Sequence, residues 1–524
     1  MILLAFSLNC GSNAFMFMDF TTIPQLTKQI FGFCPVGAAA AGECDRVGDA
    51  FVGWTYSGSL LAVCPAAIVV MATIERHRWA TYTIGMGFNC AGGWLRYAAV
   101  STAVAAAGGQ TDPGPGRVLG LASSVAIGFG AGMTCVGYSA ISAEWFPPEE
   151  RTFATSCAVQ SNYAGWALGA VVFPFAVNTV QSQLQLQLLQ AVLVSLCCAL
   201  FMAAYRENPV ARRRQHRAAA AAACGAGGVS ALTFDGDQIT AAGSSGGGGG
   251  FGSGMRLLAT NRQYVLQCTC YSLLAGVSFA VPAFQATAFR AIGLTEIESA
   301  WTNLAFIGTG VTVGLLAGKL CPDPASYPAV IKTMFVLASI SMAAAVGTAS
   351  IQQRLDPAVL YGLLVAEMML CGAAMLGFLG IGLSAVVEST HPVRPELSGG
   401  TVELFVQVFG AFFSEGGVLL GDQAFLFCGL GTWAATACVL TLYRQEFRKS
   451  GGGGRGCSSS MYTAVGSGAE EEQAEQEQEE EEEQAEEAEE QAEQEEKEQQ
   501  AEEAEEEAKP GQAVAQGAAA AVEP

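Results

Sequence analysis

Twelve stretches of about 20 mostly apolar residues follow one another along this chain. A helix of about 20 residues rises about 30 Å, the thickness of the hydrocarbon layer of a membrane. Only 14% of the residues are charged, whereas a soluble domain has about 25%. The sequence therefore predicts an all-α, multi-pass membrane protein, because a soluble protein with twelve consecutive buried helices is a poor explanation of this pattern. The expected spans are 2–24, 51–74, 79–103, 118–142, 153–177, 184–204, 264–290, 299–319, 328–349, 358–386, 398–420 and 424–443.

Small residues recur at close spacing inside these spans, as in the segment from Gly372 to Gly377. Small side chains let helix backbones approach closely in lipid, where no hydrophobic force drives helices together. The first apolar segment begins at Met1 without a basic leader and continues without a clear cleavage site, so we interpret it as the first span and not as a signal peptide.

The spans fall into two sets of six, separated by a segment rich in Gly, Ala and Arg. We predict a six-helix bundle over 1–205, a flexible cytoplasmic linker over 206–262, a second six-helix bundle over 263–445 and a disordered tail over 446–524. Two six-helix halves joined by a long loop resemble the 6+6 plan of the major facilitator superfamily.

The net charge of −22 comes from the C-terminal tail. Of the 47 acidic residues, 24 lie at or after Glu470, together with two of the 25 basic residues. The remaining chain is close to neutral, so the acidity does not indicate an acidic surface on the fold. Such dense like charge favours a solvated spacer, and a tail that binds an unidentified partner is the alternative.

The basic residues predict the orientation of the chain. With both termini in the cytoplasm, sixteen lysines and arginines fall in inner loops and five in outer loops or their margins. Inner loops of membrane proteins carry this excess of positive charge. The sequence leaves open whether the lipid bilayer is the plasma membrane or that of an organelle.

The chain carries no recognisable catalytic constellation. Its three histidines, His77, His216 and His391, all fall in predicted cytoplasmic loops, and no GxxxxGK[ST] phosphate loop is present. We therefore expect no enzyme activity, no metal site, no cofactor and no nucleic-acid partner.

Polar residues inside the spans are costly in lipid, so they indicate either a solute pathway or hydrogen bonds between helices. Glu403 and Gln407 are four residues apart and share one helix face. Aromatic residues also crowd the first and seventh spans, which face the central cavity in the 6+6 plan, and aromatic faces can bind an organic cation. The polar residues are Asn13, Asp19, Asn89, Arg96, Gln160, Asn162, Glu367, Glu403, Gln407 and Glu415, and the aromatic residues are Phe15, Phe17, Phe20, Phe279 and Phe284.

Several stretches resemble one transporter family, the feline leukaemia virus subgroup C receptor-related transporters. These are SLNCGSNAF at 7–15, NCAGGWLR at 89–96, EWFPPEER at 144–151, ESTHP at 388–392 and QVFG at 407–410. The resemblance extends over about residues 1–445, with sparse identities. It implies a twelve-helix facilitator fold and transport of haem or of choline and ethanolamine.

The resemblance also implies a substrate site. The family's choline site uses a Trp, a Tyr and two Gln, which fall on Phe17, Phe279, Tyr163 and Gln407 of this chain. Gln407 is identical and two positions keep an aromatic ring, although Phe is a weaker cation–π partner than Trp. Asp19 replaces a family Gln, and its charge would favour a cation.

The predicted inner loop after the second span contains Glu75, Arg76 and Arg78. It resembles a shortened form of the facilitator loop in which an acidic residue pairs with an arginine and holds one conformation. An ordinary positively charged inner loop is the alternative.

These observations predict a secondary transporter that moves a small organic solute, similar to choline or ethanolamine, by alternating access. The alternatives are a haem or porphyrin transporter of the same fold and a non-transporting membrane receptor or scaffold that acts through its acidic tail.

Overall fold

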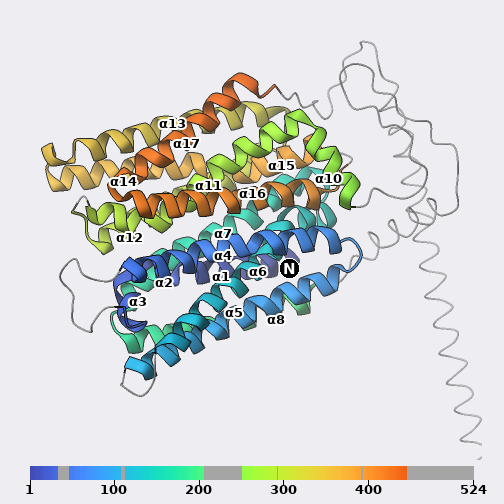
Figure 1. Cartoon of the computed structure of the whole chain (residues 1–524). Helices are drawn as coiled ribbons and strands as arrows, with labels where there is room; N and C mark the ends of the chain where they lie inside the picture. The colour runs from blue at the N-terminus through green and yellow to red at the C-terminus, as the bar shows by residue number, and fades with distance from the viewer. Residues whose placement is uncertain (34–45, 108–112, 206–250, 292, 391–392, 445–524) are drawn as a thin grey trace, which may run out of the picture. The chain divides into compact units, whose positions relative to one another are not determined.

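The computed structural model describes residues 1–33, 46–107, 113–205, 251–291, 293–390 and 393–444, and all regular secondary structure within them is helical. The predicted acidic tail and most of the predicted linker, 206–250, lie outside the described residues. Figure 1 shows the helices of the first half in blue to green and those of the second half in lime to orange.

The first half contains eight helical segments, and the first predicted span is divided among three of them. They are α1 (Ile2–Phe17), α2 (Asp19–Thr22), α3 (Pro24–Ile30), α4 (Arg46–Thr73), α5 (Arg78–Ala107), α6 (Gly114–Trp145), α7 (Pro148–Ala176) and α8 (Val180–Ala204).

The second half begins with a short helix that lies in the predicted linker, and its tenth predicted span is divided into α14 and α15. The helices are α10 (Phe251–Thr260), α11 (Arg262–Ala291), α12 (Glu296–Leu320), α13 (Tyr327–Ser350), α14 (Pro357–Met375), α15 (Leu379–Ser389), α16 (Pro395–Leu420) and α17 (Ala424–Leu442). Three 3-10 turns, η1 (Pro324–Ser326), η2 (Gln352–Arg354) and η3 (Gly421–Gln423), join neighbouring helices.

Each of the twelve predicted spans is occupied by helix. Among the described residues, nine helical spans are long and apolar enough to cross a membrane on length and composition alone. The other three predicted spans correspond to α1, which has 16 residues, and to α5 and α7, which carry Asn89, Arg96 and Gln160. Helix α1 is apolar but shorter than a full span, whereas α5 and α7 hold polar groups that are buried inside the protein.

The first span breaks between Phe17 and Pro24. Pro24 lacks a backbone N–H and begins α3, and Ile23 before it is non-helical, with φ −126° and ψ 54°. The break creates the short helix α2, whose first residue is Asp19. The prediction of one continuous helix over 2–24 is therefore replaced by three segments.

The two halves pack against each other through α4 and α16 and through α7 and α12. Helices α1, α7 and α11 lie near the same interface, and α10 packs on α11 and α16. Side chains from these helices form the site described next.

Candidate functional site

Five aromatic side chains from both halves form a continuous cluster where the halves meet. Phe17 lies 6.2 Å from Tyr56, and Tyr56 lies 6.1 Å from Trp166, measured between ring centroids. Trp166 is 5.4 Å from Tyr163 and 4.8 Å from Phe279, and Tyr163 is 5.7 Å from Phe279. Four of these pairs are edge-to-face and one is tilted, which are favourable arrangements for aromatic rings.

A hydrogen bond ties the cluster across the two halves. The Tyr56 hydroxyl of α4 donates to the backbone carbonyl of Phe279 in α11 at 2.7 Å. All five rings are at most 6% exposed, so the cluster is closed on every side in this conformation. The indole N–H of Trp166 has no hydrogen-bond partner in this closed arrangement, which leaves a buried donor available.

Polar groups of α16 lie beside the aromatic cluster. Gln407 is buried, and its side-chain amide reaches the Cys135 thiol of α6 at 3.8 Å. One turn further, Gly410 is so close to Phe279 that an added Cβ would lie 3.2 Å from the Phe279 Cβ. Gln407 therefore faces the first half and lies next to the aromatic cluster.

The structure brings four of the five predicted substrate residues into one region. Phe17, Tyr163 and Phe279 belong to the aromatic cluster, and Gln407 lies next to it. Asp19 lies in a polar network of the first half. Its carboxylate forms an ion pair with Arg96 inside the first half, so its charge is already neutralised there.

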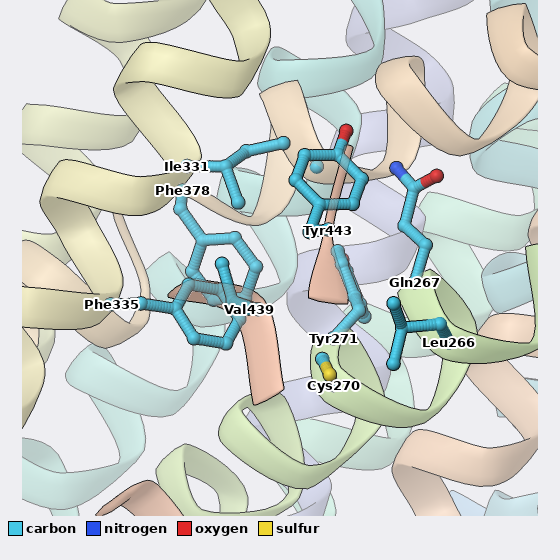
Figure 2. Close-up of a pocket in the computed structure, with 10 residues that line it drawn as sticks. Leu266, Gln267, Cys270, Tyr271, Ile331, Phe335, Phe378, Val439 and Tyr443 are labelled. Carbon is cyan, nitrogen blue, oxygen red and sulfur yellow. The ribbon is translucent and has the colours of Figure 1, made fainter. Parts of the chain in front are cut away.

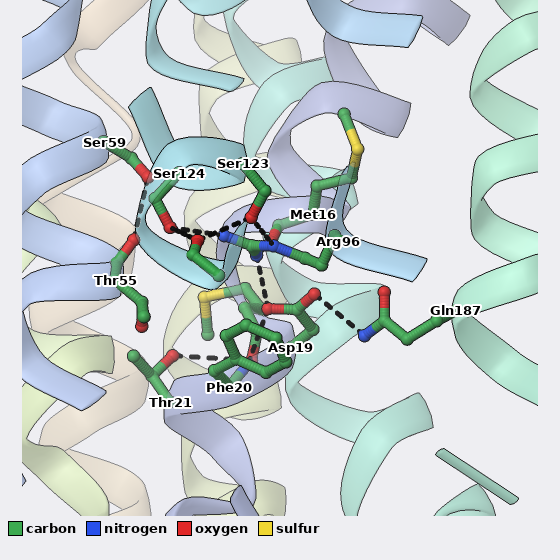
Figure 3. A network of polar contacts seen from close by, with 12 residues as sticks. Met16, Asp19, Phe20, Thr21, Thr55, Ser59, Arg96, Ser123, Ser124 and Gln187 are labelled. Atoms are coloured by element: carbon green, nitrogen blue, oxygen red, sulfur yellow. Dashed lines mark hydrogen bonds and ion pairs between the residues drawn. The ribbon is translucent and has the colours of Figure 1, made fainter. Parts of the chain in front are cut away.

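Asp19 and Arg96 form the centre of a buried polar network (Figure 3). The Arg96 guanidinium donates to Asp19 and to the Met16 carbonyl, both at 2.5 Å. The hydroxyls of Ser123 and Ser124 accept from the remaining guanidinium nitrogens at 3.1 and 2.7 Å.

The same network satisfies the second oxygen of the carboxylate. The Gln187 amide of α8 donates to Asp19 at 3.0 Å, and the Phe20 backbone N–H donates to the first oxygen at 2.6 Å. Asp19 is fully buried and Arg96 is 1% exposed. This network joins α1, α2, α5, α6 and α8, and its role is to hold the first half together.

Sequence reasoning missed Tyr56 and Trp166. Trp166 lies three residues after Tyr163, so the two share one face of α7, and this spacing was a usable signal. Tyr56 carried no comparable signal, because only the packing of α4 against the second half brings it to the cluster.

Two of the three predicted gating residues, Glu75 and Arg78, form ion pairs at the predicted cytoplasmic end. Glu75 pairs with Arg394 of the second half, and Arg78 pairs with Glu144 of α6 at 2.9 Å. The partner of Glu75 is thus an arginine from the opposite half and not Arg76, which is exposed.

A pocket lies between the halves near this end. It has a volume of about 340 Å³ and is lined by residues of α6, α7, α15 and α16. Ser139, Arg151 and Thr155 come from the first half, and Ser384, Glu388 and Arg394 from the second. The halves therefore enclose a hollow on the predicted cytoplasmic side of the aromatic cluster.

A smaller cavity of about 20 Å³ lies inside the second half (Figure 2). Its lining is mostly apolar, but Gln267, Tyr271 and Tyr443 contribute polar atoms. A cavity of this size can hold a single water molecule and is too small for an organic substrate.

Comparison with known families identifies the architecture. The family model described as "Major Facilitator Superfamily" matches residues 4–414. The chain belongs to the major facilitator superfamily. Members of this superfamily are transporters and not enzymes, so this chain is a secondary membrane transporter.

Curated relatives agree with the resemblance seen in the sequence motifs. The chain is 23% identical over 430 residues to "Choline/ethanolamine transporter FLVCR1" of Felis catus, covering 79% of this chain and 66% of that protein. It is 22% identical over 424 residues to "Choline/ethanolamine transporter FLVCR2" of Homo sapiens, covering 79% of this chain and 70% of that protein. These relatives confirm the predicted family, and the chain spans about two thirds of their length.

Solved structures show the same fold. The proton:xylose symporter XylE has a TM-score of 0.60 at 12% identity, covering 84% of this chain and 95% of that one. The transporter FucP in its outward conformation has a TM-score of 0.54 at 13% identity, covering 84% of this chain and 98% of that one.

Proposed function

We propose that this transporter carries a small organic cation of the choline and ethanolamine class by alternating access. The observation that carries the proposal is the aromatic cluster, because it is buried at the interface and both halves contribute rings. The relatives FLVCR1 and FLVCR2, which are choline/ethanolamine transporters, support the same class of substrate.

The chemistry of the cluster fits an ammonium group. A cation over an aromatic face gains up to about 2 kcal/mol when the site is desolvated, and Trp is the strongest partner. The resemblance placed a Phe where relatives have a Trp, but Trp166 supplies an indole in the same cluster. Gln407 and the unpaired N–H of Trp166 could then orient the substrate's oxygen by hydrogen bonds.

Transport follows from separating the two halves. The hydrogen bond from the Tyr56 hydroxyl to the Phe279 carbonyl joins the two halves at the aromatic cluster. The ion pair between Glu75 and Arg394 joins them at the predicted cytoplasmic end. A substrate that replaces ring–ring contacts with cation–ring contacts stabilises the loaded state. Rocking of the halves then exposes the site to one side at a time.

Replacing Trp166 with leucine tests the aromatic site. We expect the choline concentration for half-maximal uptake into proteoliposomes to rise by about tenfold, because about 2 kcal/mol corresponds to about 30-fold in affinity and the remaining rings keep part of it. Phe17→Ala is expected to have a smaller effect in the same direction, since Phe is the weaker cation–π partner.

Phe405→Ala is the matched control, because this ring is 43% exposed on the outer surface of α16. It is expected to transport choline like the unmodified protein. Choline uptake by Trp166→Leu with unchanged half-saturation would contradict the aromatic site, and absence of saturable uptake of choline and ethanolamine by the unmodified protein would contradict the substrate class.

A charge exchange tests the predicted gate. Arg394→Glu is expected to slow choline uptake by up to about fivefold, because an exposed ion pair contributes about 0.2–1 kcal/mol and like charges now face each other. Adding Glu75→Arg to the same chain is expected to restore the rate. If the double variant is slower than both single variants, the pair does not act as a gate.

The haem and scaffold alternatives remain predictions of the sequence. A haem carrier would need a wide apolar chamber, whereas the rings between these halves lie at contact distances in this conformation. The scaffold alternative depends on the acidic tail, which lies outside the described residues.

A further inference from the structure

Glu403 is a buried carboxylate at the interface of the two halves. It is 4% exposed and lies one turn before Gln407 on α16. The face of α16 that holds both residues packs against the first half, because an added Cβ at Gly400 would touch Met71 and Val136, and Gln407 itself reaches Cys135. Glu403 therefore lies on the same face of α16 as Gln407, which is next to the aromatic cluster.

The groups around Glu403 come from three helices. The Tyr271 hydroxyl of α11, which donates to the Leu379 carbonyl at 3.1 Å, is an electrostatic neighbour of the carboxyl. Cys135 and Tyr138 of α6 and Tyr163 of α7 are its other electrostatic neighbours.

Among the residues that the structure describes, Glu403 forms no ion pair. From α4, the Cys64 thiol contacts the Leu404 carbonyl at 3.9 Å. Within the described part of the chain, the arginines and lysines in ion pairs bind Asp49, Glu144, Asp19 and Glu75, and none binds Glu403.

A carboxylate that is buried between the two halves without a counter-charge has a high free energy. Ionised side chains inside a membrane protein pair with other charges or lose their charge. The buried carboxylate of Asp19 differs from that of Glu403, because Asp19 already forms an ion pair with Arg96. In the closed, empty state, Glu403 is stable as the neutral acid, and a substrate ammonium would supply the missing positive charge.

We propose that Glu403 binds a proton when the site is empty and the substrate cation when it is loaded, so that the transporter exchanges one proton for one organic cation. This inference rests on the proposed function and adds the coupling ion. When the cation enters, the carboxylic acid releases its proton to the solution on that side. When the cation leaves on the other side, the carboxylate takes up a proton there, and each cycle is electroneutral.

Polar groups of the second half line the small cavity next to Tyr271. The cavity of about 20 Å³ has Tyr271 in its wall, and its lining also includes Tyr443, whose hydroxyl has no hydrogen-bond partner, and Gln267, whose amide nitrogen has none. Figure 2 shows Tyr271, Tyr443 and Gln267 together in the lining of this cavity. A single water there would connect these polar groups to Tyr271, an electrostatic neighbour of Glu403.

Proton release on binding is the direct test. Full-length protein in weakly buffered detergent, with a pH indicator, is mixed with choline. We expect the unmodified protein to release up to one proton for each choline bound, and Glu403→Gln to release none. Glu403→Asp keeps a carboxyl group and is expected to release protons, which separates loss of the acid from loss of folding.

Uptake driven by a pH gradient is the second test. Proteoliposomes that are more acidic inside by one pH unit are expected to accumulate choline about tenfold at equilibrium through the unmodified protein, because one proton leaves for each cation that enters. Glu403→Gln is expected to lose this accumulation. Glu367→Gln is the matched control, since that carboxyl accepts from the Thr348 hydroxyl at 2.6 Å elsewhere in the second half.

The outcomes separate this inference from the proposed function. Choline binding by the unmodified protein without proton release, or gradient-driven accumulation by Glu403→Gln, would overturn the exchange and leave the substrate class intact. Failure of the unmodified protein to bind choline or ethanolamine would overturn the substrate class itself.

Discussion

Replacing Arg96 with methionine is expected to lower the free energy of unfolding by about 3–5 kcal/mol, because removing one partner of a buried ion pair leaves the other charge uncompensated. The carboxylate of Asp19 would keep only the Gln187 amide and the Phe20 N–H as donors. The Arg96 side chain also packs over the Phe20 ring, with its guanidinium carbon 4.6 Å from the ring centroid. Methionine at this position would retain part of this packing. The measurement is the midpoint of thermal denaturation of the purified protein in detergent.

Asp19→Asn is expected to be destabilising for the complementary reason, since it leaves the guanidinium without a counter-charge. The double variant Asp19→Asn/Arg96→Met is expected to recover part of the loss, because two neutral partners need no charge compensation. Arg354→Met is the matched control, as this arginine is exposed, and its effect should remain within about 0.5 kcal/mol. Strictly additive losses in the double variant would show that the two residues do not stabilise the fold as a pair.

The spans could be predicted because the length of a membrane-crossing helix is set by the thickness of the bilayer. The internal break at Met18 and Ile23 could not, because the residues of 2–24 are as apolar as those of an unbroken span. Helices α1, α5 and α7 hold the buried network and part of the aromatic cluster.

Part of the candidate site could be predicted from the sequence. The resemblance located Phe17, Tyr163, Phe279 and Gln407, which lie together in the structure. It could not decide whether Asp19 faces the substrate, because the ion pair with Arg96 joins residues 77 positions apart. The buried Glu403 was visible as a polar residue in a span, but its lack of a counter-charge depends on three-dimensional packing.

Replacing Gly372 with alanine is expected to destabilise the protein by about 3 kcal/mol, at the upper end of the cost of overpacking a core. An added Cβ at Gly372 of α14 would lie 1.8 Å from the Phe306 carbonyl oxygen of α12. This obstacle is backbone and not a flexible side chain, so the two helices must separate for the methyl group to fit.

A glycine on the same helix gives a control with the opposite sign. Gly362 of α14 is exposed, and an added Cβ there would have no neighbour within 4 Å. Gly362→Ala is expected to leave the thermal midpoint unchanged or to raise it, because alanine favours a helix over glycine by up to about 1 kcal/mol. Equal midpoints for the two alanine variants would show that α12 and α14 do not approach as closely as described. A loss confined to Gly372→Ala would show that the small residues of 372–377 are required by the contact between these two backbones.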